Sequence, residues 1–223
     1  MPGAAQIWSG VREVVEVKRS GDRWLIVDTL VSLRRLGIAL AIAVTLSVAL
    51  GLFMGTFTVV DAFLSPFVRA VSKIPPLALL PILFIYLGVE ERPKLALMVI
   101  GIAPTLIQDV SLRIQEVPQE TVNKAYTLGA STLEVAFRVI LAQCWPKILH
   151  SIRLVLGPLW VFLIASEAIS AESGLGYRIY VVQRQLGVHI ILPYILWISA
   201  LGATMDAAIR GWVKWRHPWA EAA

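Results

Sequence analysis

Residues 117–149 read VPQETVNKAYTLGASTLEVAFRVILAQCWPKIL and form a polar interruption between two long apolar regions. Pro118 suits the first turn of a helix, and we expect that helix over residues 121–128. Gly129 suits its end, because glycine adopts the left-handed conformation that stops a helix without a side-chain penalty. The interruption therefore begins as a short water-exposed helix followed by a tight turn.

The turn is followed by the signature of a second helix. Ser131 or Thr132 can cap its first turn, and Glu134 can complete a capping box. We expect this helix over residues 133–141, with the whole hairpin ending at residue 149. A polar helical hairpin inside an apolar chain predicts a docking surface for a partner outside the membrane.

The composition places the chain among membrane proteins. Of its 223 residues, 57% are hydrophobic and only 16% are charged, against about 25% charged residues in soluble domains. The mean hydropathy is +0.74. The net charge of +5 comes from basic residues that flank apolar runs instead of forming one patch, so we do not expect nucleic acid as a partner. The single cysteine, Cys144, cannot form an intrachain disulfide.

Five apolar segments are candidates for membrane spans, for which a bilayer requires roughly 20 residues per helix. They cover residues 36–60, 74–89 (extended by 62–71), 95–108, 154–171 and 186–205. Backbone in lipid must satisfy its own hydrogen bonds, which isolated strands do not. We therefore predict an all-α polytopic membrane protein with about five transmembrane helices.

Prolines interrupt several of these segments. Pro75, Pro76 and Pro81 fall in the second one, where they predict a kink or break because proline lacks the donor for a helical hydrogen bond. Freed backbone groups are tolerated in a membrane only against protein or a wet cavity, which places this segment toward the bundle interior. Pro104 and Pro158 allow the same interpretation, or an ordinary kink.

We divide the chain into an amphipathic interfacial segment (1–35), a transmembrane domain (36–212, with the hairpin inside it) and a C-terminal tail (213–223). Basic residues in the hairpin and in the tail put both in the cytoplasm by the positive-inside rule. Three spans before the hairpin then put the N-terminus outside, although the N-terminal segment is basic as well.

The hairpin resembles the EAA loop of ABC importer permeases, in the branch that imports nitrate, sulfonate, taurine or bicarbonate. The residues that fall on the pattern of that loop are Ala125, Gly129, Ala130-Ser131, Val139-Ile140-Leu141 and Pro146. The chain departs from the pattern at Asn123, Lys124 and Ala142, which replace the consensus Glu, the first Ala and the first Pro.

Shorter matches extend the resemblance from about residue 29 to residue 219. They are Ser-Leu-Arg within 29–35, the prolines of 74–81, Leu-Gly-Val at 87–89, and Glu167 followed by Ser-Gly-Leu-Gly-Tyr at 173–177. Their order and spacing together are more specific than any one of them. Members of the family commonly have one more span at the start, so this chain is either shortened there or a five-span version.

The resemblance implies a MetI-like fold and the permease subunit of an ATP-driven importer, multi-pass in the bacterial inner membrane. Such a subunit would form a homodimer with two ATPase subunits and an extracytoplasmic solute-binding protein, and would move a small solute, an anion by this resemblance. The hairpin would seat in the ATPase through Lys124, Ala125, Leu128, Gly129, Ala130 and Ser131. The chain has no Gly-x4-Gly-Lys-Ser/Thr pattern, so we expect no enzyme activity and no cofactor in it, with ATP and Mg²⁺ bound by the ATPase.

Polar residues within the apolar segments are candidates for a translocation path: Ser72, Thr105, Gln108, Asp109, Ser166 and Glu167. An ionised Glu167 in a span costs at least about 2.5 kcal/mol unless it is paired or wet. It either lines the path or hydrogen-bonds to a neighbouring helix, and a carboxylate would repel an anionic cargo. The three histidines lie at no metal-ligand spacing, so we predict no metal site.

Two other classes of membrane protein fit the composition. An ion-coupled secondary transporter is the main alternative, but such proteins often show internal repeats with matching broken helices, and we find no repeat. An intramembrane enzyme needs paired catalytic groups at one depth, whereas Asp109 and Glu167 lie toward opposite ends of their spans. The sequence does not name the cargo.

Overall fold

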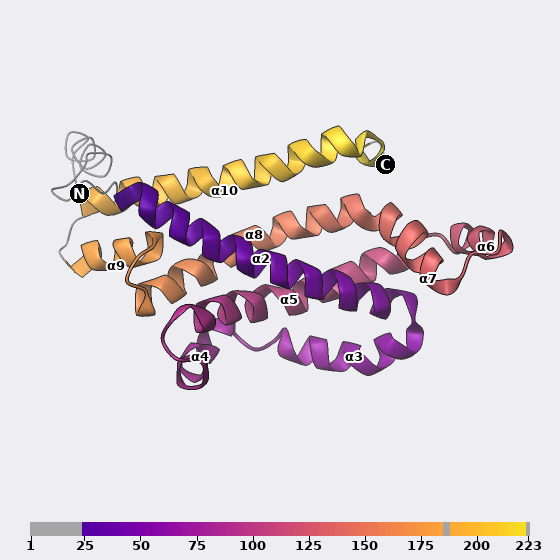
Figure 1. The fold of residues 1–223 in the computed structure, drawn as a ribbon, viewed down its shortest axis with the longest axis horizontal. Coiled ribbons are helices and arrows are strands. Elements are labelled where there is room, and N and C mark those ends of the chain that lie inside the picture. Colours follow the sequence, from indigo (N-terminus) through magenta and orange to yellow (C-terminus); the bar gives the residue numbers. More distant parts are fainter. Residues whose placement is uncertain (1–23, 185–187, 222–223) are drawn as a thin grey trace. The chain divides into compact units, whose positions relative to one another are not determined.

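A computed structural model describes residues 24–184 and 188–221, and these fold into helices without a strand. The elements in chain order are α2 (Trp24–Thr56), α3 (Thr58–Val71), η1 (Pro76–Leu79), α4 (Leu80–Leu87), α5 (Glu91–Gln115), α6 (Gln119–Thr127), α7 (Thr132–Glu134), η2 (Val135–Ile140), α8 (Leu141–Ser170), α9 (Leu175–Arg184), α10 (Val188–Arg216) and η3 (Pro218–Glu221) (Figure 1).

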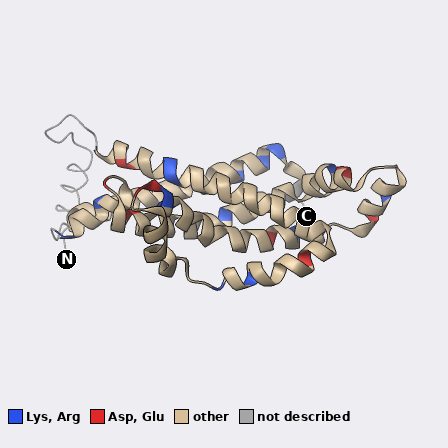
Figure 2. Cartoon of the chain, turned by 60° about the horizontal axis from the view of Figure 1, so that its bottom comes forward, with Lys and Arg blue, Asp and Glu red and all other residues tan. Residues whose placement is uncertain are grey.

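Four helical stretches are long and apolar enough to cross a membrane, namely α2, α5, the run Thr132–Ser170 that ends with α8, and α10. A fifth span is possible if the bent pair Thr58–Val71 and Pro76–Leu87 is taken as one. Figure 2 shows long uncharged stretches along these helices. The predicted all-α architecture with about five spans is confirmed.

The predicted break at the proline pair is confirmed. Helix α3 ends at Val71, and the chain resumes helical structure only at Pro76, after a bend of 79°. Pro104 and Pro158 do not break their helices, since both lie inside the continuous α5 and α8. Of these three places, the chain therefore breaks at the adjacent Pro75 and Pro76 and not at Pro104 or Pro158.

The first span differs from the segment expected at 36–60. Helix α2 already begins at Trp24, so residues 24–35 of the expected interfacial segment continue into the span as one helix. Residues 1–23 lie outside the described part of the chain. The helix ends at Thr56 because Phe57 is extended (φ −114°, ψ 110°), and the chain then turns into α3.

The chain clusters into two compact units, and each is described by itself. Unit 1 comprises Met1–Leu40, Pro76–Val99 and Pro158–Met205; unit 2 comprises Ala41–Pro75, Ile100–Gly157 and Asp206–Ala223. The four long helices α2, α5, α8 and α10 each contribute residues to both.

In unit 2, small residues bring α2 close to α5. Ser47, Gly51 and Gly55 recur every four residues and so lie on one face of α2. A Cβ at Gly51 would lie 2.7 Å from Val110, and one at Gly55 would lie 2.6 Å from Ile114. This is the small-residue packing that membrane helices use, because lipid supplies no hydrophobic driving force between helices.

Candidate functional site

The hairpin turn is built by hydrogen bonds that match its sequence. Gly129 has φ +85°, the left-handed region that glycine favours. Its N–H donates to the Tyr126 carbonyl at 2.9 Å, and the Ala130 N–H donates to the Ala125 carbonyl at 3.1 Å. These two bonds satisfy the last carbonyls of α6 in a Schellman motif. The expected stop at Gly129 is therefore present, with α6 itself at Gln119–Thr127.

The second helix of the hairpin begins with the expected capping box. The Ser131 hydroxyl accepts from the Glu134 N–H at 3.4 Å, and the Glu134 carboxylate accepts from the Ser131 N–H at 3.0 Å. This helix does not end near residue 141 as expected. It passes through the π-helical turn η2 into α8, which contains Pro146, so Thr132–Ser170 is one helical rod. One end of the rod is the hairpin and the other lies within unit 1.

The surface of the hairpin is apolar where the chain turns. Leu128 is 88% exposed, and Lys124, Gly129 and Ser131 are exposed beside it, while Ala125 and Ala130 are half-buried. Apolar side chains held in water on a polar loop indicate a contact surface. The sequence analysis did not single out three further exposed apolar residues of this surface: Tyr126, Leu133 and Phe137. The sequence signal that could have identified these three residues is the presence of large apolar side chains in an otherwise polar loop.

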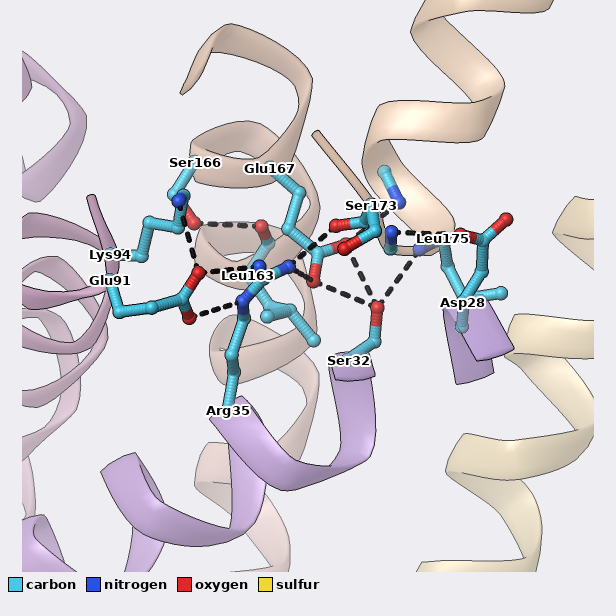
Figure 3. Close-up of polar contacts among 12 residues, drawn as sticks. Asp28, Ser32, Arg35, Glu91, Lys94, Leu163, Ser166, Glu167, Ser173 and Leu175 are labelled. Atoms are coloured by element: carbon cyan, nitrogen blue, oxygen red, sulfur yellow. Dashed lines mark hydrogen bonds and ion pairs between the residues drawn. The ribbon is translucent and has the colours of Figure 1, made fainter. Parts of the chain in front are cut away.

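A second constellation lies in unit 1, around Glu167 near the end of α8 (Figure 3). Its side chain has no exposed surface. Both carboxylate oxygens accept from the Ser32 hydroxyl at 2.8 and 2.9 Å, one accepts from Arg35 Nη1 at 2.8 Å, and the other from the Gly176 N–H at 2.9 Å. A buried charge is tolerated only when it is paired and hydrogen-bonded in this way.

Arg35 links this carboxylate to the start of α5. Its Nε and Nη2 donate to the two oxygens of Glu91, both at 2.6 Å, and its Nη1 also donates to the Ser173 carbonyl at 2.7 Å. Lys94 Nζ lies 3.3 Å from Glu91. The planar guanidinium suits this two-pronged contact. The charges of the two carboxylates, Glu91 and Glu167, thus equal those of the two cations, Arg35 and Lys94. Their contacts connect α2, α5 and α8 within unit 1 (Figure 3).

A third acidic residue fastens the turn before α9. The buried Asp28 accepts from the Gly174 N–H at 3.0 Å and from Arg178 Nε at 2.8 Å, and the guanidinium of Arg178 lies 4.2 Å from the ring centroid of Trp24. Asp28, Ser32 and Arg35 are spaced by four and three residues, so one face of α2 presents all three. We call the set Asp28, Ser32, Arg35, Glu91, Lys94, Glu167 and Arg178 the charge network.

The glycines of this turn have no room for a side chain. Gly174 has φ +127°, and a Cβ there would lie 2.6 Å from the Glu167 carboxylate. A Cβ at Gly176 would lie 2.5 Å from the Ile164 carbonyl oxygen. The Gly-Leu-Gly sequence at 174–176 is therefore required for the backbone to approach a buried carboxylate.

The structure divides the expected path residues between the two units. Ser166 and Glu167 belong to unit 1; both are fully buried, and Ser166 donates to the Leu163 carbonyl at 2.8 Å. Of the two alternatives for Glu167, the geometry favours the hydrogen bond between helices over a lining role. Sequence reasoning missed Arg35 as its partner, because Arg35 stands at the edge of an apolar run and was assigned to the interfacial segment.

The other expected path residues lie in unit 2. Ser72 caps α3 and donates to the Arg69 carbonyl at 2.9 Å, Thr105 is exposed on α5, and Asp109 lies 3.4 Å from Arg113. Gln108 lines a cavity of about 300 Å³. Gln108 is therefore an expected path residue that lines a cavity of this unit.

The family described as the binding-protein-dependent transport system inner membrane component matches residues 43–215. The chain belongs to this family. The resemblance drawn from the hairpin and the shorter motifs is confirmed. As a member, the chain is a multi-pass inner-membrane permease subunit of an ABC transport system, and the family is a transport component, not a class of enzyme.

Relatives of the permease extend over most of its length. A probable ABC transporter permease of Brucella abortus is 32% identical over 203 residues, covering 86% of this chain and 79% of the relative. The taurine transport system permease of Escherichia coli is 31% identical, with coverage of 84% and 68%. A bicarbonate transport system permease of Synechocystis is 27% identical, with coverage of 84% and 68%.

The fold of the permease is also found among solved structures. A chain of the MetNI methionine ABC transporter, in an inward-facing conformation, superposes with a TM-score of 0.72 at 16% sequence identity. The match covers 82% of this permease and 91% of that chain. The expected MetI-like fold is confirmed.

Proposed function

We propose that the permease forms a homodimer that binds two ATPase subunits through its hairpins and receives its cargo from an extracytoplasmic solute-binding protein. ATP and Mg²⁺ bind to the ATPase subunits, where hydrolysis takes place. The surrounding lipid is the remaining partner. The description of the family as binding-protein-dependent supports this assembly.

The observation that best supports the proposal is that the second helix of the hairpin continues directly into a membrane span. The exposed surface around Leu128 and Gly129 lies next to the capping box that starts the rod Thr132–Ser170. A helix transmits displacement along its axis, and this run is helical from Thr132 to Ser170 in spite of the π-helical turn and Pro146. Closure of the ATPase pair around ATP would displace α6, and α8 would carry that displacement into the membrane.

We further propose that the cargo is a small anion of the sulfonate or bicarbonate class. The support is the named function of relatives, which include taurine, aliphatic sulfonate and bicarbonate permeases at 27–31% identity. The burial of Glu167 is in keeping with this cargo, because its carboxylate is fully buried and paired with Arg35.

The test is co-purification of the permease with the ATPase encoded beside its gene, followed by ATP hydrolysis in proteoliposomes. Leu128→Glu places a charge on the exposed apolar surface and removes no buried contact. Gly129→Asp also adds a charge, and Gly129→Asn is its neutral control, since Asn accepts the left-handed conformation. Glu120→Gln in the first turn of α6 is a second control.

We expect the wild type and both controls to retain the ATPase, and Leu128→Glu and Gly129→Asp to lose it while keeping their helical content. Retention of ATPase by both charged variants would show that the hairpin is not the docking surface. A wild type that binds no ATPase would refute the assembly itself.

A further inference from the structure

Unit 2 contains a polar cavity that the proposed coupling mechanism does not use. It has a volume of about 300 Å³, at the small end of ligand cavities, and lies between the ends of α2 and α5 and the middle of α3. Its polar lining residues are Asp61, Ser65, Arg69, Gln108, Ser111 and Gln115. Arg69 and Gln115 are exposed at this cavity, while Ser65 and Ser111 are buried. An uncompensated polar group in a membrane costs free energy, so polar side chains there require water or a partner.

Arg69 is the cation of this cavity. It lies in the last turn of α3, where its Nε donates to the hydroxyl of the buried Ser65 at 2.9 Å and its Nη2 donates to the same oxygen. Among the described residues no carboxylate lies within ion-pair distance of Arg69. A guanidinium has five N–H donors, and here Nη1 has no partner in the described part of the chain.

Several other arginines of unit 2 do have carboxylate partners. Arg113 contacts Asp109 and Glu116, and Arg153 contacts Asp206 at 2.7 Å. Ionisable groups in spans are ordinarily paired or line a water-filled path. Arg69 lines a cavity but has no carboxylate partner among the described residues. A mobile anion in the cavity can therefore complete the coordination of its guanidinium.

The position of Arg69 in the fold agrees with transport. Helix α3 is the first half of the broken span, and Arg69 lies two residues before its last residue, Val71, ahead of the 79° bend. Broken helices mark substrate sites in several classes of transporter, because they bring polar groups into the membrane where a cavity covers them.

Helix α5 supplies neutral donors on the opposite wall. Gln108, Ser111 and Gln115 are spaced by three and four residues and so form a stripe on one face. Gln108 donates to the Pro104 carbonyl at 3.2 Å, and Gln115 donates to the Ser111 hydroxyl at 3.3 Å. Each amide group has a second N–H, and the Ser111 hydroxyl has its own hydrogen. Neutral donors of this kind solvate an anion without holding it so strongly that it cannot leave.

Asp61 lies at the other end of the same cavity. It precedes Arg69 by eight residues of α3, or about 12 Å along the helix axis. Its carboxylate repels an anion at that end, which confines an anionic ligand to the neighbourhood of Arg69 and favours a single negative charge over two.

We propose that Arg69, oriented by Ser65 and faced by Gln108 and Ser111, coordinates the oxyanion group of the cargo as it crosses the permease. The ligand class is a singly charged sulfonate or bicarbonate group. This inference rests on the proposed function and adds to it the residue that recognises the anion inside the membrane.

The test uses the complete transporter in proteoliposomes, with its ATPase and its solute-binding protein, and labelled taurine, ethanesulfonate and bicarbonate as probes. Uptake of each probe that the wild type transports is compared in Arg69→Gln, Arg69→Lys and Ser65→Ala. Arg216→Gln, at the exposed end of α10, is the matched control for loss of one arginine. ATP hydrolysis without the binding protein reports on assembly in every variant.

We expect Arg69→Gln to lower uptake at least about tenfold, as loss of a hydrogen bond to a charged group predicts, with unchanged ATPase binding and basal hydrolysis. Arg69→Lys should recover part of the uptake because it restores the charge, and Ser65→Ala should lower uptake less than Arg69→Gln. Arg216→Gln should transport like the wild type.

Uptake by Arg69→Gln at the wild-type rate would overturn the anion site and leave the permease function intact. Loss of ATPase binding in Arg69→Gln and Arg69→Lys alike would also overturn it, since Arg69 would then support the fold. A wild type that transports no probe and binds no ATPase would instead refute the proposed function.

Discussion

Arg35 Nη1 lies 2.8 Å from Glu167 Oε1, and the two side chains are 6% and 0% exposed. The pair joins residues 132 positions apart in the chain. Both side chains are buried, so the two charges depend on each other and on the hydroxyl and backbone donors around them (Figure 3). The network fixes the ends of α2, α5 and α8 in unit 1, together with the glycine turn before α9.

Substitution of Glu167 by Gln should destabilise the permease strongly. The amide keeps the shape of the carboxylate but turns an NH₂ group toward donors from Arg35, Ser32 or Gly176. Breaking a buried pair by removing one partner costs about 3–5 kcal/mol. Thermal unfolding in detergent should show a much lower Tm than for Glu172→Gln, an exposed glutamate five residues on. Equal Tm values for the two variants would contradict a buried network.

Substitution of Gly174 by Ala should also lower stability, for two reasons. The backbone has φ +127°, and the new Cβ would lie 2.6 Å from the carboxylate of Glu167. Gly37→Ala is the control, because no atom lies within 4 Å of a Cβ built at that helical position. There the change should stabilise by about 0.4–1 kcal/mol. Opposite shifts in Tm are expected, and shifts of the same sign would argue against the tight turn.

Substitution of Gly51 by Leu should prevent the close approach of α2 to α5 in unit 2. A Cβ at this position already meets the Val110 side chain at 2.7 Å and the Ile107 carbonyl oxygen at 3.0 Å. We expect loss of monodisperse protein on size exclusion. Gly157→Leu, where a Cβ has no neighbour within 4 Å, should purify like the wild type. A well-behaved Gly51→Leu variant would show that the two helices are not packed through this glycine.

The stability of the hairpin base should depend on pH through Glu116. Its contact with Lys147 at 2.6 Å lowers the pKa of the Glu116 carboxyl below its ordinary value, with Arg113 adding to the effect. A lowered folded-state pKa contributes stability that is present above the ordinary carboxyl pKa and is lost as the pH falls through the lowered one. The contribution is small because the pair is exposed.

Hydrogen exchange of residues 112–120 measured between pH 7 and pH 3 tests this dependence. Exchange, corrected for its intrinsic pH dependence, should accelerate at the acidic end in the wild type. In Glu116→Gln the corrected rate should be raised already at pH 7 and should change less with pH. Identical profiles for the two proteins would exclude Glu116 as the titrating group.

Local rules are sufficient for the hairpin and for the break in the second span. Gly129 and the pair Ser131 and Glu134 act through backbone groups within five residues, and adjacent prolines remove helical hydrogen bonds wherever they occur. The end of the second hairpin helix was not predictable in this way. This helix was expected to end at residue 141, but the rod continues to Ser170, since packing of an apolar helix outweighs the hydrogen bond lost at Pro146.

The sequence by itself determined that this protein is a helical membrane protein with a capped hairpin, because hydropathy, capping and turn chemistry are local, and the motifs of the hairpin carried the resemblance to ABC importer permeases. Only the tertiary structure decided that Glu167 is paired with Arg35, and that Arg69 lines a cavity with no carboxylate partner among residues 24–184 and 188–221. In the sequence, an ionisable residue in an apolar segment looks the same whether it forms a buried ion pair or lines a cavity. Which of the two it occupies depends on helices that are distant in the chain and adjacent in the fold.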